Sequence, residues 1–76
     1  MKLGVYQHYK TKNYYRVLGV AKHTETLEKL VVYESLYDNP GNKLWVRPLD
    51  MFLEELEIDG KKIPRFQYIE NYIPIK

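Results

Sequence analysis

Cysteine is absent from this sequence of 76 residues. Its absence excludes disulfide bonds, thiolate metal ligands and thiol nucleophiles, and it is typical of small domains of the reducing cytoplasm, where we expect this protein to act. A long apolar run is also missing, because the longest one, residues 17–21, is far shorter than the roughly 20 residues that cross a bilayer. Gln7 and His8 interrupt residues 1–9 too early for a secretory signal. We therefore expect no membrane partner.

Groups for catalysis are scarce as well. Ser35 is the single serine, and it lacks the flanking glycines that expose a nucleophile at a sharp turn. The four glycines are scattered, and none forms a phosphate-cradling loop with a lysine. The sequence therefore argues against serine catalysis and excludes P-loop nucleotide hydrolysis.

Two histidines and two glutamates are the candidates for polar chemistry. His23 and Glu25 would share a face if the strand continues, Glu28 follows closely, and His8 would join them from the first strand. Acid–base catalysis by His23 and Glu25 is therefore one hypothesis. The spacing of these residues matches no metal site, so we predict no bound metal. We also predict no cofactor, and we assign no residue a catalytic role. In the competing interpretation, Glu25 and Thr26 hold a hairpin loop through hydrogen bonds to backbone amides, with His23 packed beside them.

The apolar residues follow the period of short strands. Apolar residues make up 45% of the chain and charged residues 29%, which is typical of a globular domain with a packed core. Gly19 inside a long strand candidate predicts a bulge or bend, Asp59-Gly60 predicts a hairpin turn, and Pro64 limits the last strand to an edge or a bulge. Strands are predicted at residues 5–10, 14–23, 30–37, 44–47, 56–58 and 63–69, with turns between them that include residues 38–42.

The expected architecture is a small SH3-like antiparallel barrel of five or six short strands, mainly β in class. Pro48 opens one short helical turn near residues 48–53, which we expect to be 3₁₀-like. An OB-type barrel and a flat sheet with a helix at residues 49–57 are the alternatives. We assign residues 1–67 to a single domain and residues 68–76 to a tail that covers a sheet edge, its own or that of a homodimer partner.

Charge is unevenly distributed although the net charge is only +2. One interpretation places the basic and acidic segments on neighbouring surface strands that complement each other. The other is an exposed basic face for an anionic partner. Residues 1–24 contain no acid and residues 50–59 no base; their charged residues are Lys2, Lys10, Lys12, Arg16 and Lys22 in the first segment, and Asp50, Glu54, Glu55, Glu57 and Asp59 in the second.

Aromatic residues are abundant, with eight tyrosines, one tryptophan and two phenylalanines. If Leu44 and Val46 face the core, strand alternation places Trp45 and Arg47 on the opposite, exposed face. Such a surface is suited to a protein or peptide partner, which is the function that we favour. In the competing interpretation, Trp45, Phe52 and Phe66 simply form the core. The predicted aromatic and arginine groove consists of Tyr33, Tyr37, Trp45, Arg47 and Phe52.

Single-stranded nucleic acid is the alternative partner. In this hypothesis three basic side chains contact phosphates and three tyrosines stack on bases, and binding falls steeply as salt is raised. The residues are Lys10, Lys12 and Arg16 for the phosphates, and Tyr9, Tyr14 and Tyr15 for the bases.

Several motifs resemble a small bacterial family catalogued as domain of unknown function 1653. The resemblance covers residues 6–66, and it implies an SH3-type barrel with no assigned activity. The tail after Tyr68 lies outside the pattern. The motifs are Tyr6-x-His8-Tyr9-Lys10, Tyr15-Arg16-Val17-Leu18-Gly19-Val20-Ala21, His23-x-Glu25-Thr26, Leu30-Val31-Val32-Tyr33, Leu36-Tyr37, Leu44-Trp45-Val46-Arg47-Pro48, Met51-Phe52 and Pro64-Arg65-Phe66.

Overall fold

The computed structural model describes residues 1–37, 41 and 43–72. Most of the turn predicted at residues 38–42 and the end of the predicted tail lie outside these residues. The elements are β1 (Gly4–His8), β2 (Tyr14–Lys22), β3 (Lys29–Ser35), β4 (Leu44–Pro48), α1 (Leu49–Phe52), β5 (Glu55–Ile58), β6 (Lys61–Pro64) and β7 (Phe66–Tyr68).

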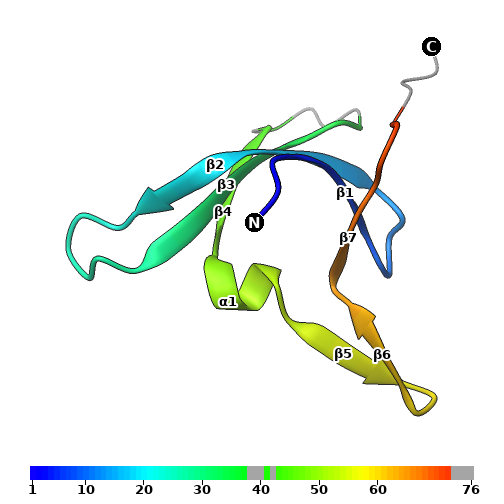
Figure 1. Ribbon diagram of the computed structural model, residues 1–76. Coiled ribbons are helices and arrows are strands. Elements are labelled where there is room, and N and C mark those ends of the chain that lie inside the picture. The colour runs from blue at the N-terminus through cyan, green and yellow to red at the C-terminus, as the bar shows by residue number, and fades with distance from the viewer. Residues whose placement is uncertain (38–40, 42, 73–76) are drawn as a thin grey trace.

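The strands form a bent antiparallel sheet and a separate hairpin. The sheet has five strands in the order β4-β3-β2-β1-β7, and it arches over α1 in Figure 1. β5 and β6 pair only with each other and project beyond α1. The predicted mainly β, antiparallel class with one short helix is therefore confirmed. Closure into an SH3-like barrel is not confirmed, because within the described chain β4 and β7 are the end strands of an open sheet.

The strand predicted at residues 63–69 is in fact two strands in different sheets. Its first part belongs to β6, which pairs with β5 across the predicted Asp59-Gly60 turn. Its second part is β7, which pairs with β1. Pro64 has no amide hydrogen with which to extend a ladder, and Arg65 between the two strands donates its amide to Glu54 O at 2.9 Å. The chain therefore changes partner at this point.

Gly19 marks a β-bulge in β2, as predicted. Val17 pairs with Tyr33 while Gly19 pairs with Val32, so the register shifts by one residue between them. An extra residue on one strand bends that strand and increases its twist. This bend contributes to the curvature that lets one face of the sheet surround a core.

The core lies between the concave face of the sheet and α1. Phe66 is at its centre, and its ring stacks on Phe52 with 4.2 Å between centroids. The rings of His8, Tyr15 and Tyr33 meet Phe66 edge-on at 5.0–5.9 Å. Contacts of this geometry add about 0.5–1.5 kcal/mol each beyond the area they bury. One side chain thus joins β1, β2, β3 and α1 to β7.

The helical turn is an α-helix and not the 3₁₀-like turn that we predicted. The amide of Leu53 donates to Leu49 O at 3.0 Å, which is the four-residue spacing of an α-helix. Pro48 is the N-cap residue and the last residue of β4, so it lies one position before the helical turn that we expected it to open. The helix is only long enough to bury Phe52, which is 1% exposed.

The boundary predicted between residues 67 and 68 falls inside β7. Tyr68 is opposite Tyr6 of β1, and the amide of Ile69 donates to Val5 O at 2.9 Å. The first residues of the predicted tail therefore lie along the edge of β1.

Candidate functional site

The two faces of β4 are the reverse of the predicted arrangement. Leu44 and Val46 are exposed, at 53% and 61%, and do not face the core. Trp45 and Arg47 alternate with them, and they pair with Tyr33 and Val31 on the buried side of β3. The pattern Leu-Trp-Val is apolar throughout, so alternation alone does not reveal which face is buried.

Arg47 is held on the aromatic core by two contacts. Its Nε donates to the hydroxyl of Tyr33 at 3.5 Å, and its guanidinium lies 5.5 Å from the centre of the Phe66 ring. Its side chain makes no ion pair with an acid among residues 1–37, 41 and 43–72. The result is a half-buried, oriented guanidinium whose remaining donors suit an anionic group.

Trp45 and Tyr37 extend this cluster toward the surface. Trp45 is 40% exposed and lies opposite Tyr33 in the ladder. The hydroxyl of Tyr37 lies 3.4 Å from that of Tyr15, whose ring meets Tyr33 edge-on. Burial, and then the hydrogen bond with Tyr37, raise the pKa of Tyr15 to about 12. We call Tyr37, Trp45 and Arg47 the aromatic–arginine surface.

Two members of the predicted groove are not available to a ligand. Tyr33 is 5% and Phe52 1% exposed, since both pack against Phe66 in the core. The competing interpretation is correct for Phe52 and Phe66, but not for Trp45, which is 40% exposed. The predicted groove therefore keeps its surface members and loses its buried ones.

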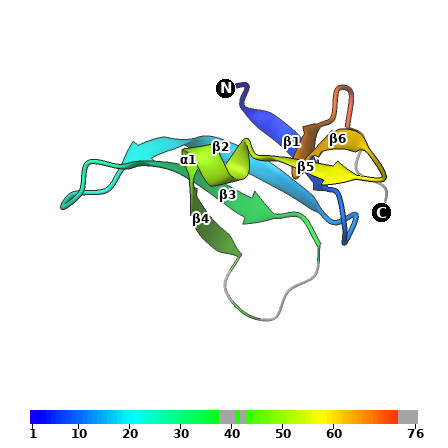
Figure 2. The ribbon, with the colours of Figure 1, turned by 90° about the horizontal axis from the view of Figure 1, so that it is seen from below.

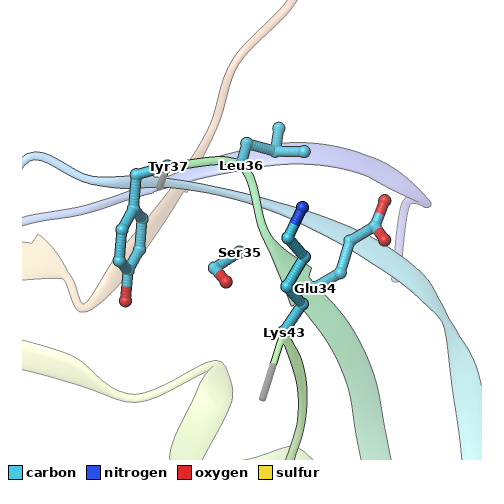
Figure 3. A pocket seen from close by; sticks show the side chains of 5 residues that line it. All are labelled: Glu34, Ser35, Leu36, Tyr37 and Lys43. Atoms are coloured by element: carbon cyan, nitrogen blue, oxygen red, sulfur yellow. The ribbon is translucent and has the colours of Figure 1, made fainter. Parts of the chain in front are cut away.

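A pocket at the end of β3 adjoins this surface, and the sequence analysis missed it. It is lined by Glu34, Ser35, Leu36, Tyr37 and Lys43 (Figure 3). The hydroxyls of Ser35 and Tyr37 point to one side of the chain, and the ammonium of Lys43 points toward Leu36 and Glu34 (Figure 3). Ser35 Oγ is buried and has no hydrogen-bond partner among the described residues. A lone serine in an apolar strand was the only sequence signal.

One of the six residues of the nucleic-acid hypothesis, Tyr15, is turned toward the core and away from the exposed lysines. Lys10 and Lys12 are exposed in the β1–β2 loop. Arg16 forms an ion pair with Glu34 at 3.5 Å. Tyr15 packs against the core, whereas the ring of Tyr14 meets Tyr72. Tyr9, the sixth, is half-buried beside the His8 ring.

The two histidines occupy equivalent positions in two hairpin loops. Nδ1 of His8 accepts hydrogen bonds from the amides two and three residues later, at 3.2 and 3.4 Å. Nδ1 of His23 does the same at 3.0 and 3.3 Å. In both loops a threonine three residues after the histidine accepts an amide through Oγ1, Thr11 at 3.3 Å and Thr26 at 3.2 Å. The repeated His-x-x-Thr spacing was a sequence signal for this shared loop.

This loop geometry bears on the acid–base hypothesis. An imidazole that accepts amide hydrogens at Nδ1 carries its own proton on Nε2, so no ring lone pair is left for a substrate or a metal. Glu25 contacts His23 through its backbone amide, which donates to Nδ1 of His23. Glu28 contacts His23 through its backbone carbonyl, which accepts the His23 amide at 2.8 Å. His8 lies at the other end of β2. No group of three potential ligands suited to a metal ion occurs among the described residues.

Folding stability should decrease below neutral pH because of His8. Its pKa is lowered from 6.5 by burial first, and then by the charges of Arg47, Arg65 and Lys10. The unfolded chain therefore binds a proton at higher pH than the folded one, so stability is full above pH 6.5 and falls as the pH drops toward the folded pKa. Urea unfolding at a series of pH values tests this, with His8→Gln as the variant expected to flatten the slope. An equal slope in both proteins contradicts it.

The basic and acidic segments do not neutralise each other within the chain. β5, in the acidic segment, pairs with β6 and lies outside the main sheet. The described ion pairs are Arg16 with Glu34 and Arg65 with Glu54, and neither joins the two segments. The interpretation of complementary neighbouring strands is therefore wrong, because the two segments lie in different sheets.

The architecture and the surface describe a small β protein with an open antiparallel sheet and one short helix. Residues 4–68 match the model of the family "Protein of unknown function (DUF1653)", and the chain belongs to this family. It is similar to a crystal structure of a protein of that family from Bordetella bronchiseptica. The two share 36% identity with a TM-score of 0.86, over 99% of this chain and 95% of the other. A comparison with curated proteins found no match. In the described chain no helix is long and apolar enough to span a membrane.

Proposed function

We propose that this protein is a cytoplasmic binding module that holds an extended, acidic segment of a partner protein on its aromatic–arginine surface. The observation that carries the proposal is Arg47, whose guanidinium is oriented by Tyr33 and Phe66 without an acidic partner in the described chain. Oriented arginines next to exposed tryptophan and tyrosine are typical of interface hot spots. The strongly bent sheet with one helical turn supports an SH3-like architecture, in which a peptide groove is a common use of the fold.

The chemistry of the neighbouring residues supports an acidic partner. Trp45 and Arg47 alternate with Leu44 and Val46 along β4, so an aromatic and a basic residue follow one another on the same face. Ser35 offers a buried hydroxyl in the adjoining pocket. An extended segment would place a carboxylate near Arg47 and an apolar residue against Trp45.

Replacing Arg47 with lysine should weaken binding of an acidic peptide roughly tenfold, because lysine keeps the charge but loses the planar fork. A pool of random octapeptides with two fixed glutamates serves as the probe. Trp45 is the sole tryptophan, so its fluorescence reports binding at the site directly. Arg16→Lys is the matched control, since Arg16 is exposed and ion-paired to Glu34 on the opposite face. An equal effect of both variants, or no binding to the pool, contradicts the proposal.

Nucleic acid is the alternative outcome of the same titration. A mixed single-stranded DNA pool that binds at about 50 mM salt, and no longer at about 200 mM, would favour the basic N-terminal segment. The separation of Tyr15 from the exposed lysines argues against this outcome.

A further inference from the structure

The distal half of β2 has an unpaired edge. β1 pairs with β2 only as far as Gly4, which is opposite Val17. Beyond this point β2 continues to Lys22, as Figure 2 shows, and no strand of the described residues pairs with it on that side. Natural proteins usually cover such edges, because free amides and carbonyls pair readily with another strand.

The hydrogen-bond pattern identifies the free groups on this edge. The amide of His23 donates to Glu28 O at 2.8 Å, so the backbone amide and carbonyl of His23 point toward the strand that contains β3. Hydrogen-bonded residues alternate along an antiparallel ladder, so the backbone amide and carbonyl of Ala21 also point toward β3. The amides and carbonyls of Val20 and Lys22 therefore point away from β3, on the side where β1 no longer pairs with β2.

β5 presents a second free edge, of opposite charge. The amide of Arg65 donates to Glu54 O at 2.9 Å. The backbone amides and carbonyls of every second residue after Glu54, namely Leu56 and Ile58, therefore point toward β6. The amides and carbonyls of Glu55 and Glu57 consequently point outward, away from β6. Both glutamates are exposed, and neither forms an ion pair in the described chain.

We propose that the β5 edge of one copy pairs antiparallel with the free β2 edge of a second copy, so that the chain self-associates. The register places Glu55 opposite Lys22 and Glu57 opposite Val20, and these four residues supply outward amides and carbonyls in matching positions. An opposite-charge pair directly across a ladder is stabilising, whereas a like-charge pair is destabilising. This inference uses residues outside the aromatic–arginine surface and is independent of it.

Side-chain sizes on the other face of the joint ladder also match. The same register sets Leu56 against Ala21 and Ile58 against Gly19. A Cβ at Gly19 would meet no atom within 4 Å, so the space beside it is open. Ile58 is 36% exposed in the single chain, and its side chain would be partly buried against Gly19 of the second copy. Large apolar residues of the acidic strand thus lie over the small residues of the basic one, which is the complementarity that a packed interface needs.

Because both edges are present on every copy, the contact joins unlike surfaces and association increases with protein concentration. Sedimentation equilibrium of the full chain at about 50 mM salt should show a weight-average mass that rises with concentration. Raising the salt to about 200 mM should lower it, because the Lys22–Glu55 pair is exposed to screening. Amide exchange at Val20, Lys22, Glu55 and Glu57 should slow as concentration rises. A monomer at all concentrations up to about 1 mM overturns the proposal.

Charge reversal provides the decisive comparison. Lys22→Glu and Glu55→Lys should each weaken association roughly tenfold, and the double variant should restore it, since the pair is then reversed but again opposite. Lys10→Glu changes net charge equally in an exposed loop, and it should leave association unchanged. Circular dichroism of each variant confirms folding. Equal weakening by Lys10→Glu, or no recovery in the double variant, refutes the pairing.

Discussion

Replacing Phe66 with alanine is expected to lower the free energy of unfolding by about 3–5 kcal/mol, which is most of the stability of a domain of this size. The ring stacks on Phe52 and receives the edges of three further rings, so its removal leaves a cavity where five elements meet. The side chains around it are anchored in the sheet and in α1, and collapse of the cavity would require both to move. Much of the population should be unfolded at room temperature.

Urea denaturation followed by circular dichroism measures this loss. Leu18→Ala serves as the control, because Leu18 is 46% exposed and its truncation should cost less than about 0.5 kcal/mol. A Phe66→Ala protein within 1 kcal/mol of the unchanged chain would show that the sheet does not depend on this ring.

Truncation after Gln67 is expected to cost about 2–4 kcal/mol and to expose the edge of β1. The shortened chain loses Tyr68, whose ring lies 5.3 Å from that of Tyr6 and carries the ammonium of Lys2 above it at 4.9 Å. It also loses the hydrogen bond from the Ile69 amide to Val5 O. The free edge of β1 then becomes a place for non-native pairing, so we also expect a larger average mass in solution.

The variant Tyr68→Ala in the full chain separates the two contributions. It removes the ring but keeps the backbone pairing, so it should lose stability without gaining association. A truncated protein with unchanged stability and unchanged oligomeric state would contradict the role assigned to β7.

Local signals in the sequence were sufficient for most elements. Gly19 indicated the bulge, Asp59-Gly60 the hairpin and Pro48 the start of the helix, because each depends on backbone preferences of one or two residues. The resemblance to the family was also confirmed. The α-helical form of the turn was missed, since a single turn has few residues to distinguish the two hydrogen-bond spacings.

Tertiary features were harder to predict. The burial of Trp45 and Arg47 relative to Val46 depends on which side of β4 meets Phe66, and Phe66 is distant in sequence. The division of residues 63–69 between two sheets depends on β1 as a competing partner. The open sheet has the same cause, because β5 and β6 form a ribbon of their own.

The candidate site was predicted only in its exposed part. Tyr37, Trp45 and Arg47 stay a proposed surface: Tyr37 contacts Tyr15, Arg47 contacts Tyr33, and Trp45 lies opposite Tyr33 in the ladder. The pocket at Ser35 was missed because a buried hydroxyl without a partner leaves no pattern in a sequence. The matching His-x-x-Thr loops were detectable by comparing the two hairpins.

The most direct test of the proposed binding surface is an NMR titration of the labelled protein with the glutamate-containing peptide pool. We predict that the indole N–H of Trp45 and the Nε–H of Arg47 shift most, and that a matched pool with two fixed lysines leaves them unchanged. Shifts confined to residues 10–16, or equal shifts with both pools, would contradict the assignment of this surface.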